Sequence, residues 1–285
     1  MYGYVNFPYD HGLLVKEELS EHGYVESQSD DDLGRYLYLF EIRERLVPAR
    51  PYRVHLSREI LRNLQFPLLR PTIDEVIARM TAGQPLAPYL STLANKLVTH
   101  DHLLVHWGVH HLHLEPLCTL DERGYVARAD NLLFFRVNGA DIHLIDILPH
   151  NPSPFAQDEL VKIVDRNWPQ LHQQMRGFTT RVLSPAQIKK LRKGNLNTAV
   201  QTDTRVVMPA FGATSAGRSL AGVLEADRIF ADLRRLEGLV AENYERWFPR
   251  SSAWITNVRL VGVEKDGYNL VDGASGYTLQ LERTS

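Results

Sequence analysis

The 285-residue sequence has a single cysteine, Cys118, no long hydrophobic run and almost no net charge. One cysteine cannot form an internal disulfide, and it excludes zinc modules built from several cysteines. No stretch of about 18 apolar residues occurs, and the first twenty residues lack the basic and apolar regions of a secretory signal. We therefore expect a cytoplasmic protein that does not interact with membranes.

The formal net charge is −2 at pH 7, so the surface as a whole should not attract nucleic acid. Residues 176–205 are more basic than the rest of the chain, because they contain seven lysines and arginines and a single acid, Asp203. Such a run is typical of a solvated helix face, and it also suits the binding of a polyanion. Under the second interpretation, four residues would hold backbone phosphates: Lys189, Lys190, Arg192 and Lys193.

The spacing of apolar residues predicts five helices, over residues 71–83, 87–107, 158–169, 184–194 and 220–248. Thr72 and Glu75 have the spacing of a capping box for the first helix, and Gly83 suits its end. Ser184 and Pro185 are typical of a helix start.

Alternating apolar and polar residues predict three strands, over residues 109–117, 132–139 and 141–150, the last two joined by a hairpin at NGAD. A short strand should run into Ser57, a suitable helix cap, and the C-terminal tail predicts two or three further strands. The stretch LGRYLYLFEIRERL suits a helix and a strand equally.

These patterns predict an α+β fold. A central antiparallel β-meander at about residues 108–150 is packed with helices, and a long C-terminal helix and a terminal β-hairpin follow. We divide the chain into residues 1–98, a mixed and helical region, 99–205, the histidine-rich sheet with its helices, and 206–285, a glycine loop, the long helix and the hairpin.

Histidines are concentrated in VTHDHLLVHWGVHHLHLEP, residues 98–116. On a strand, His111, His113 and Glu115 would share one face, while His110 would point to the other. Two histidines at this spacing can chelate a metal, and buried imidazoles can equally be structural groups that bond to backbone and carboxylates. The remaining three, expected on the preceding helix, are His100, His102 and His106.

A third interpretation is acid/base chemistry without a metal. Cleavage of RNA by its own 2′-hydroxyl needs a base, an acid and a cation beside the phosphate, which histidine and arginine can supply. The meander carries five candidates: His111, His113, Arg128, Arg136 and His150. Arg136 shares a strand face with apolar residues, and Asp146 is its expected structural partner.

The segments WGVHHLHL, GYVARADNLLFFRVNGADIHLIDILPH and RNWPQL resemble a family of uncharacterised bacterial proteins with a similar motif, over about residues 50–245. That resemblance implies no activity. More remotely, the three strands are similar to the core sheet of RelE-type ribonuclease toxins. This second resemblance implies phosphate stabilisation by Arg128 or Arg136 and acid/base chemistry by His150.

The glycine loop GATSAGRS, residues 212–219, has P-loop spacing with arginine in the lysine position. The sequence that follows predicts one helix and antiparallel strands, which is not the parallel sheet of a nucleotide triphosphatase. A flexible connector is one interpretation. Free N–H groups at the start of the long helix, with Arg218 beside them, could also bind a phosphate of a larger ligand.

We therefore expect a metal-independent endoribonuclease without a cofactor, acting as a toxin-like or phage-defence effector. RNA would be its substrate, and an inhibitory or antitoxin protein would restrain it. Two alternatives stay open: a metal-dependent hydrolase that uses the same histidines, and a non-catalytic module that binds a protein or a nucleotide.

Overall fold

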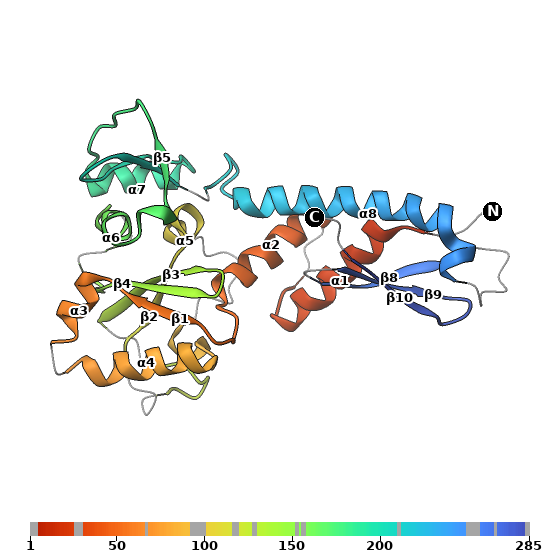
Figure 1. The fold of residues 1–285 in the computed structure, drawn as a ribbon, viewed down its shortest axis with the longest axis horizontal. Helices are drawn as coiled ribbons and strands as arrows, with labels where there is room; N and C mark the ends of the chain where they lie inside the picture. Colours follow the sequence, from red (N-terminus) through yellow and green to blue (C-terminus); the bar gives the residue numbers. More distant parts are fainter. Residues whose placement is uncertain are drawn as a thin grey trace. The chain divides into compact units, whose positions relative to one another are not determined.

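The computed structural model describes most of the chain in eleven segments (Figure 1). They are residues 5–25, 31–65, 68–91, 101–115, 120–126, 130–151, 154, 158–209, 212–248, 257–264 and 267–282. Contacts divide the chain into two compact units: unit 1 comprises Met1–Phe40 and Gly222–Ser285, and unit 2 comprises Glu41–Ala221. Unit 1 thus contains residues from both ends of the chain. The division predicted from the sequence, into residues 1–98, 99–205 and 206–285, placed these ends in separate regions.

Unit 1 combines helices with a three-stranded antiparallel sheet of order β10-β9-β8. Its elements are α1 (Phe7–Glu21), most of α2 (Asp32–Arg45), most of α8 (Leu220–Trp247), β8 (Val258–Val263), β9 (Gly267–Asp272) and β10 (Thr278–Glu282). The buried carboxylate of Asp10 on α1 accepts a hydrogen bond from the Leu260 N–H at 2.9 Å, which fastens the helix to the sheet. The predicted long C-terminal helix and terminal hairpin are confirmed, and the ambiguous stretch LGRYLYLFEIRERL is helical.

The main sheet of unit 2 has the order β1-β4-β3-β2. Its strands are β1 (Arg53–Leu56), β2 (Val109–His113), β3 (Asn131–Asn138) and β4 (Asp141–Pro149). Strands β2, β3 and β4 form the predicted antiparallel meander, and Gly139 supplies the left-handed backbone, φ 58°, that the β3–β4 hairpin needs. Strand β1 pairs with β4 in parallel, which the sequence did not predict.

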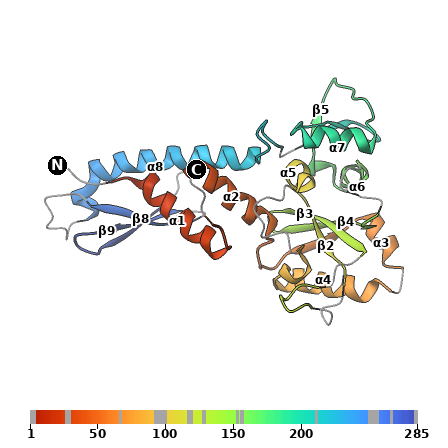
Figure 2. The ribbon, with the colours of Figure 1, turned by 180° about the vertical axis from the view of Figure 1, so that it is seen from behind.

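Both faces of this sheet are covered (Figures 1 and 2). Helices α3 (Arg58–Asn63) and α4 (Arg70–Ala82) pack on one face, where Leu133 and Phe135 belong to the core. Helices α5 (His102–Trp107) and α6 (Glu159–Asn167) pack on the other, against Leu132 and Phe134. Because adjacent β3 residues enter opposite cores, β3 is apolar on both sides.

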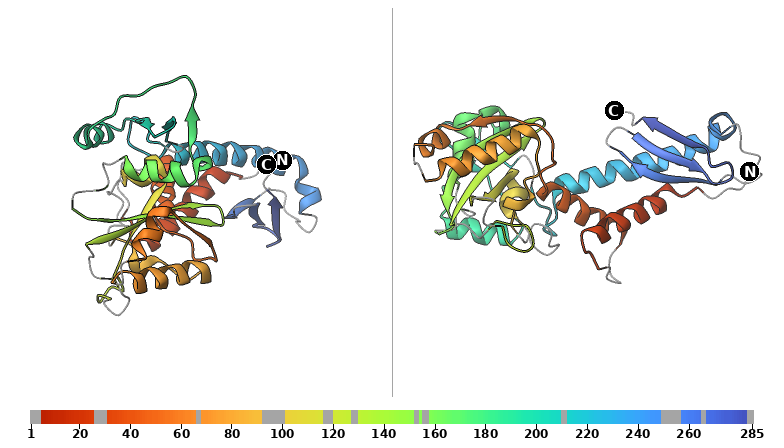
Figure 3. Two further views of the ribbon diagram at one scale, coloured as in Figure 1. Left: turned by 60° about the vertical axis from the view of Figure 1, so that its left-hand side comes forward. Right: turned by 90° about the horizontal axis from the view of Figure 1, so that it is seen from below.

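A third layer of unit 2 lies beyond α5 and α6 (Figure 3). It contains α7 (Pro185–Lys193) and a small antiparallel sheet of order β5-β7-β6, with 3-10 turns elsewhere in the unit. Its strands are β5 (Gln173–Met175), β6 (Val200–Gln201) and β7 (Val206–Met208), and the turns are η1 (Ala87–Tyr89) and η4 (Pro169–Leu171). Val200 and Val207 complete the core around Trp107, so this layer is packed onto the rest of unit 2.

Several predicted helix ends are confirmed, and one predicted capping residue is wrong. The Ser57 and Ser184 side chains cap α3 and α7, and Gly83 ends α4 with φ 71°. Thr72 does not cap α4, because that helix begins at Arg70, before the predicted box.

Residues 87–107 do not form one helix: η1 ends at Leu90 in extended backbone, and Asp101 caps the short α5. His100 lies outside the described residues. Among the helices that are described, none has the length and apolar content needed to cross a bilayer.

Candidate functional site

Strand β2 distributes its three histidines as the alternation predicts. His110 stacks on Phe135 at a centroid distance of 5.1 Å, on the α4 face of the sheet. Burial lowers the pKa of His110 to about 4, so this ring is neutral at physiological pH. His111 and His113 pair with Phe134 and Leu132, on the face that α5 and α6 cover.

Three imidazole rings lie next to one another along that face, at the end of the sheet where β4 finishes. The ring centroids of His111 and His113 are 6.2 Å apart, and those of His113 and His150 are 6.4 Å apart. The His150 N–H donates to the Asp130 carbonyl at 2.7 Å, which fixes the backbone after β4 beside the start of β3. His111, His113 and His150, here called the histidine row, were all predicted site residues that the fold brings together.

Asp101 adds a carboxylate to the histidine row, a role that the sequence pattern did not predict. Its Oδ2 lies 3.5 Å from His111 Nδ1, while Oδ1 accepts hydrogen bonds from the N–H groups of Leu103 and Leu104 at 3.0 and 3.1 Å. Burial alone would raise the pKa of Asp101, but its bond to His111 and the N–H groups of α5 lower it below the usual value. An ionised carboxylate therefore fixes the His111 ring.

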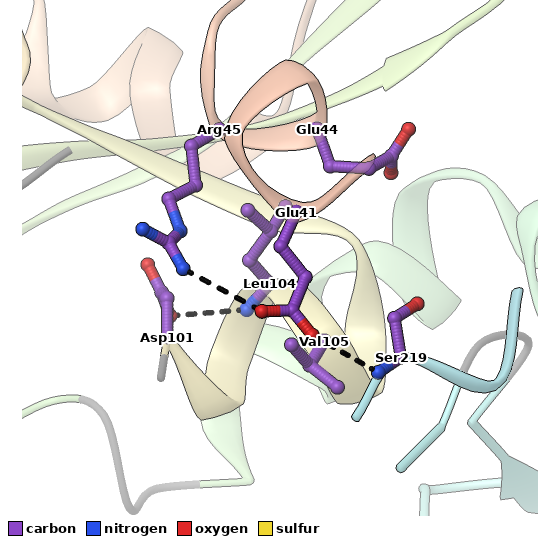
Figure 4. Close-up of a pocket in the computed structure, with 7 residues that line it drawn as sticks. All are labelled: Glu41, Glu44, Arg45, Asp101, Leu104, Val105 and Ser219. Atoms are coloured by element: carbon purple, nitrogen blue, oxygen red, sulfur yellow. Dashed lines mark hydrogen bonds and ion pairs between the residues drawn. The ribbon is translucent and has the colours of Figure 1, made fainter. Parts of the chain in front are cut away.

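Asp101 also contributes to the lining of a small pocket (Figure 4). Seven residues line it: Glu41, Glu44, Arg45, Asp101, Leu104, Val105 and Ser219. Arg45 and the Ser219 N–H both point toward the Glu41 carboxylate, at 3.9 and 3.4 Å, and Arg218 Nε is 3.4 Å from it. Arg218 thus lies beside a carboxylate of the chain itself, and its predicted phosphate contact stays a prediction.

The glycine loop is closed by its own hydrogen bonds rather than open like a P-loop. Asn197 bonds to both the N–H and the carbonyl of Ala213, at 2.9 and 3.0 Å, and Asn195 donates to the Ser215 carbonyl at 3.1 Å. Gly212 N–H donates to Val105, and Gly217 N–H to Thr214. These N–H groups of the loop are occupied, whereas the predicted contact of a phosphate with the start of the long helix and Arg218 stays a prediction.

Arg136 lies away from the histidine row, toward the opposite end of β3. It is 6% exposed, pairs with His143 across the sheet, and its charge acts on His143 and His172. Burial lowers the pKa of Arg136 to about 10, and those of His143 and His172 to about 4. The predicted partnership with Asp146 is wrong, because that carboxylate accepts from the Asn63 amide at 2.8 Å and from the Ile147 N–H.

A second group of charged residues joins β1 to β4, and the sequence analysis did not find it. His55 Nε2 is 2.7 Å from Asp141 Oδ1, and Arg53 donates two hydrogen bonds to the same carboxylate, at 2.9 and 2.8 Å. The Arg53 bonds, followed by the His55 bond, lower the pKa of Asp141 to about 2. The His55 ring stacks on His143 at 4.8 Å.

The predicted substrate-binding residues divide into an exposed and an inward-facing set. Lys189, Lys190 and Lys193 are exposed on α7. Arg192 on the same helix is buried, and the charges of Asp158 and Asp101 oppose the lowering of its pKa that burial causes. Arg128 lies outside the described residues, so its predicted role stays a prediction.

Within the described segments, no three His, Cys, Asp or Glu side chains are grouped in a way that could hold a metal ion. His111 and His113 share a face, but Glu115 follows the end of β2 and does not complete a triad with them. No protein-family model matches the chain, and neither a curated protein nor a solved structure shows significant similarity to it.

Proposed function

We propose that unit 2 is a metal-independent endoribonuclease whose acid and base belong to the histidine row. The observation that carries this proposal is the sequence of neighbouring rings from His111 through His113 to His150, with Asp101 bound to the first of them. His111 keeps 18% of its side chain exposed and His150 is half-buried, so an RNA phosphate can approach their edges.

The chemistry would follow from the positions of the rings. His111 takes the proton of a 2′-hydroxyl, and Asp101 stabilises the imidazolium that results. The 2′-oxygen then forms a bond to phosphorus while the bond from phosphorus to the 5′-oxygen breaks, and His150 gives the leaving oxygen its proton. His113, between the two, donates to a phosphate oxygen whose negative charge grows in the transition state.

A cation beside the phosphate is still needed, and the described structure does not support Arg136 in that role. Arg136 is buried next to His143 and His172, at a distance along β3 from the histidine row. Arg128, which lies outside the described residues, stays the candidate that the sequence offers for the phosphate contact. A toxin-like or phage-defence role, and an inhibitory partner, would follow from such an activity.

Purified full-length protein incubated with RNA in excess chelator tests the proposal. General acid/base groups contribute about 100- to 10,000-fold to a rate, so His111→Ala and His150→Ala should each slow cleavage by at least about 100-fold. His113→Ala, which removes a donor to the transition-state phosphate, should slow it by about 100-fold as well. Arg128→Ala should do the same. The matched control is His55→Ala, which removes a partly exposed histidine at the other end of the same face and should retain activity within about threefold.

Two results would contradict the proposal. Cleavage that requires an added divalent metal would favour a metal-dependent hydrolase. Absence of cleavage by the wild type, with and without metal, would favour a non-catalytic binding module.

A further inference from the structure

The segment between β5 and the end of α7 is the most positively charged part of the chain. No aspartate or glutamate occurs from residue 166 to residue 202, although the whole sequence contains 34 of them. Seven cations lie in this stretch: Arg166, Arg176, Arg181, Lys189, Lys190, Arg192 and Lys193. The positive potential of this segment therefore differs from that of the near-neutral protein around it.

Five of these cations are directed to solvent. Arg166 pairs with Glu59 and Glu159, and Arg192 is buried. The others are exposed and have no carboxylate partner within the described part of the chain: Arg176, Arg181, Lys189, Lys190 and Lys193. Charges that are neither neutralised nor buried are available to an anionic partner.

The two arginines belong to a loop that also exposes large apolar side chains. Residues 176–184 connect β5 to α7 without regular structure, and Figure 1 shows them as an extended loop. Phe178 is 62% exposed and Val182 is 74% exposed. Two arginines, Arg176 and Arg181, thus lie in the same short loop as two exposed apolar side chains, Phe178 and Val182.

The lysines continue this surface along α7. Ile188 and Arg192, four residues apart, form the buried face of the helix. Lys189 and Lys193 are also four residues apart, so they lie one above the other on an exposed face, with Lys190 beside Lys193. We call residues 176–193, from Arg176 through the last turn of α7, the basic arm.

We propose that the basic arm binds single-stranded nucleic acid, with Phe178 stacking on a base and the five exposed cations contacting phosphates. An exposed aromatic ring among arginines and lysines is the combination that single-strand binding uses, because every unpaired base offers a face for stacking. In a duplex those faces are covered by neighbouring base pairs, so the basic arm prefers single strands. An acidic protein would use the cations and would gain little from Phe178.

Arg192, on the buried side of α7, is electrostatically coupled to the carboxylate of the histidine row. The charge of Asp101, the carboxylate that holds His111, opposes the lowering of the pKa of buried Arg192 on α7. One part of this inference rests on the proposed function, namely that the bound strand is the substrate of the nuclease. The binding itself is independent of catalysis and can be measured alone.

Fluorescence anisotropy of the full-length protein with a labelled 20-nucleotide 2′-O-methyl oligouridine tests the inference, because this probe has no free 2′-hydroxyl and is not cleaved. Phe178→Ala should weaken binding about tenfold, as expected for the loss of one stacked base. Its control is Leu224→Ala, which removes an equally exposed apolar side chain, 62%, from α8 in unit 1.

The charge contribution is tested with Lys189→Glu/Lys193→Glu. Affinity should fall at least tenfold, and the salt dependence of binding should become shallower, because fewer counterions are released. Arg234→Glu, a reversal at an exposed position of α8, is the control and should bind like the wild type.

Three outcomes would overturn the inference: no binding of the wild type to the single strand, equal binding of a duplex of the same length, and an unchanged affinity in Phe178→Ala. Poly-L-glutamate that competes as well as the oligouridine would indicate an acidic protein as the partner instead. If the oligouridine binds as predicted and RNA is not cleaved, the basic arm is supported while the proposed nuclease activity fails.

Discussion

Asp101 holds His111 and starts α5 with the same carboxylate: one oxygen lies 3.5 Å from His111 Nδ1, and the other accepts from the first N–H groups of the helix. Asparagine caps helices about as well as aspartate and carries no charge. Asp101→Asn should therefore keep stability within about 0.5 kcal/mol of the wild type, while RNA cleavage slows and its pH profile shifts.

Asp101→Ala removes the cap as well as the charge. We expect it to lose about 1 kcal/mol of stability in urea unfolding, in addition to the loss of activity. Equal stability losses in the two variants would mean that the charge, and not the cap, stabilises this region. Full activity in both would remove Asp101 from the site.

The buried histidines should make unit 2 sensitive to mild acid. Burial lowers the pKa of His143 to about 4, below the value of about 6.5 for an unfolded chain. The unfolded state therefore binds a proton that the folded state does not, and stability falls as the pH decreases from about 6.5 to about 4. His172 adds a contribution of the same sign.

His143→Phe keeps a ring between His55 and Trp168 and removes the titration. The slope of unfolding free energy against pH should become smaller by up to about 1.4 kcal/mol per pH unit between pH 4 and 6.5, the value for one proton. Urea unfolding at several pH values measures this slope. An unchanged slope would show that His143 binds its proton equally in the folded and unfolded states.

The closed glycine loop predicts a difference between two glycine substitutions. Gly217 and Gly124 both have left-handed backbone, φ 79° and 81°, so alanine at either position costs about 1 kcal/mol. At Gly217 the new Cβ would also lie 2.9 Å from Asn195 Oδ1, whereas at Gly124 it meets nothing within 4 Å. Gly217→Ala should therefore destabilise the protein by about 1 kcal/mol more than Gly124→Ala in chemical unfolding. Equal losses would mean that Asn195 moves freely.

Ser57 should contribute more to stability than an ordinary helix cap does. Its hydroxyl accepts from the Ile60 N–H at 2.9 Å and donates to the Ile145 carbonyl of β4 at 2.6 Å, and the residue is fully buried. Ser57→Ala should cost about 2–3 kcal/mol, because two buried polar groups lose their partner. Ser184→Ala removes an exposed cap and should cost about 1 kcal/mol. Similar losses in thermal unfolding would contradict the account of Ser57.

The meander could be predicted because its signals are local. Alternation fixes which residues of a strand share a face, and the NGAD turn fixes the register of β3 against β4. The faces of His110, His111 and His113 followed from these two facts. The helix starting at Asp101 had a local signal too, since aspartate before an apolar turn is a common cap, but one long helix fitted the apolar spacing better.

The parallel pairing of β1 with β4 could not be predicted. Strand β1 has four residues, and a long stretch of chain separates it from its partner, so its register carries no sequence signal. The contact of His55 with Asp141 and His143 depends entirely on that register. For the same reason, the burial of Arg136 beside His172 was not visible in the alternation of β3.

The chemical ends of the RNA fragments test the central claim most directly. Attack by the 2′-hydroxyl at the histidine row leaves a 2′,3′-cyclic phosphate on one fragment and a 5′-hydroxyl on the other, in the presence of chelator. Fragments that end in a 3′-hydroxyl and a 5′-phosphate, formed when a divalent metal is added, would contradict the assignment of His111 as the base, His113 as the phosphate-binding group and His150 as the acid.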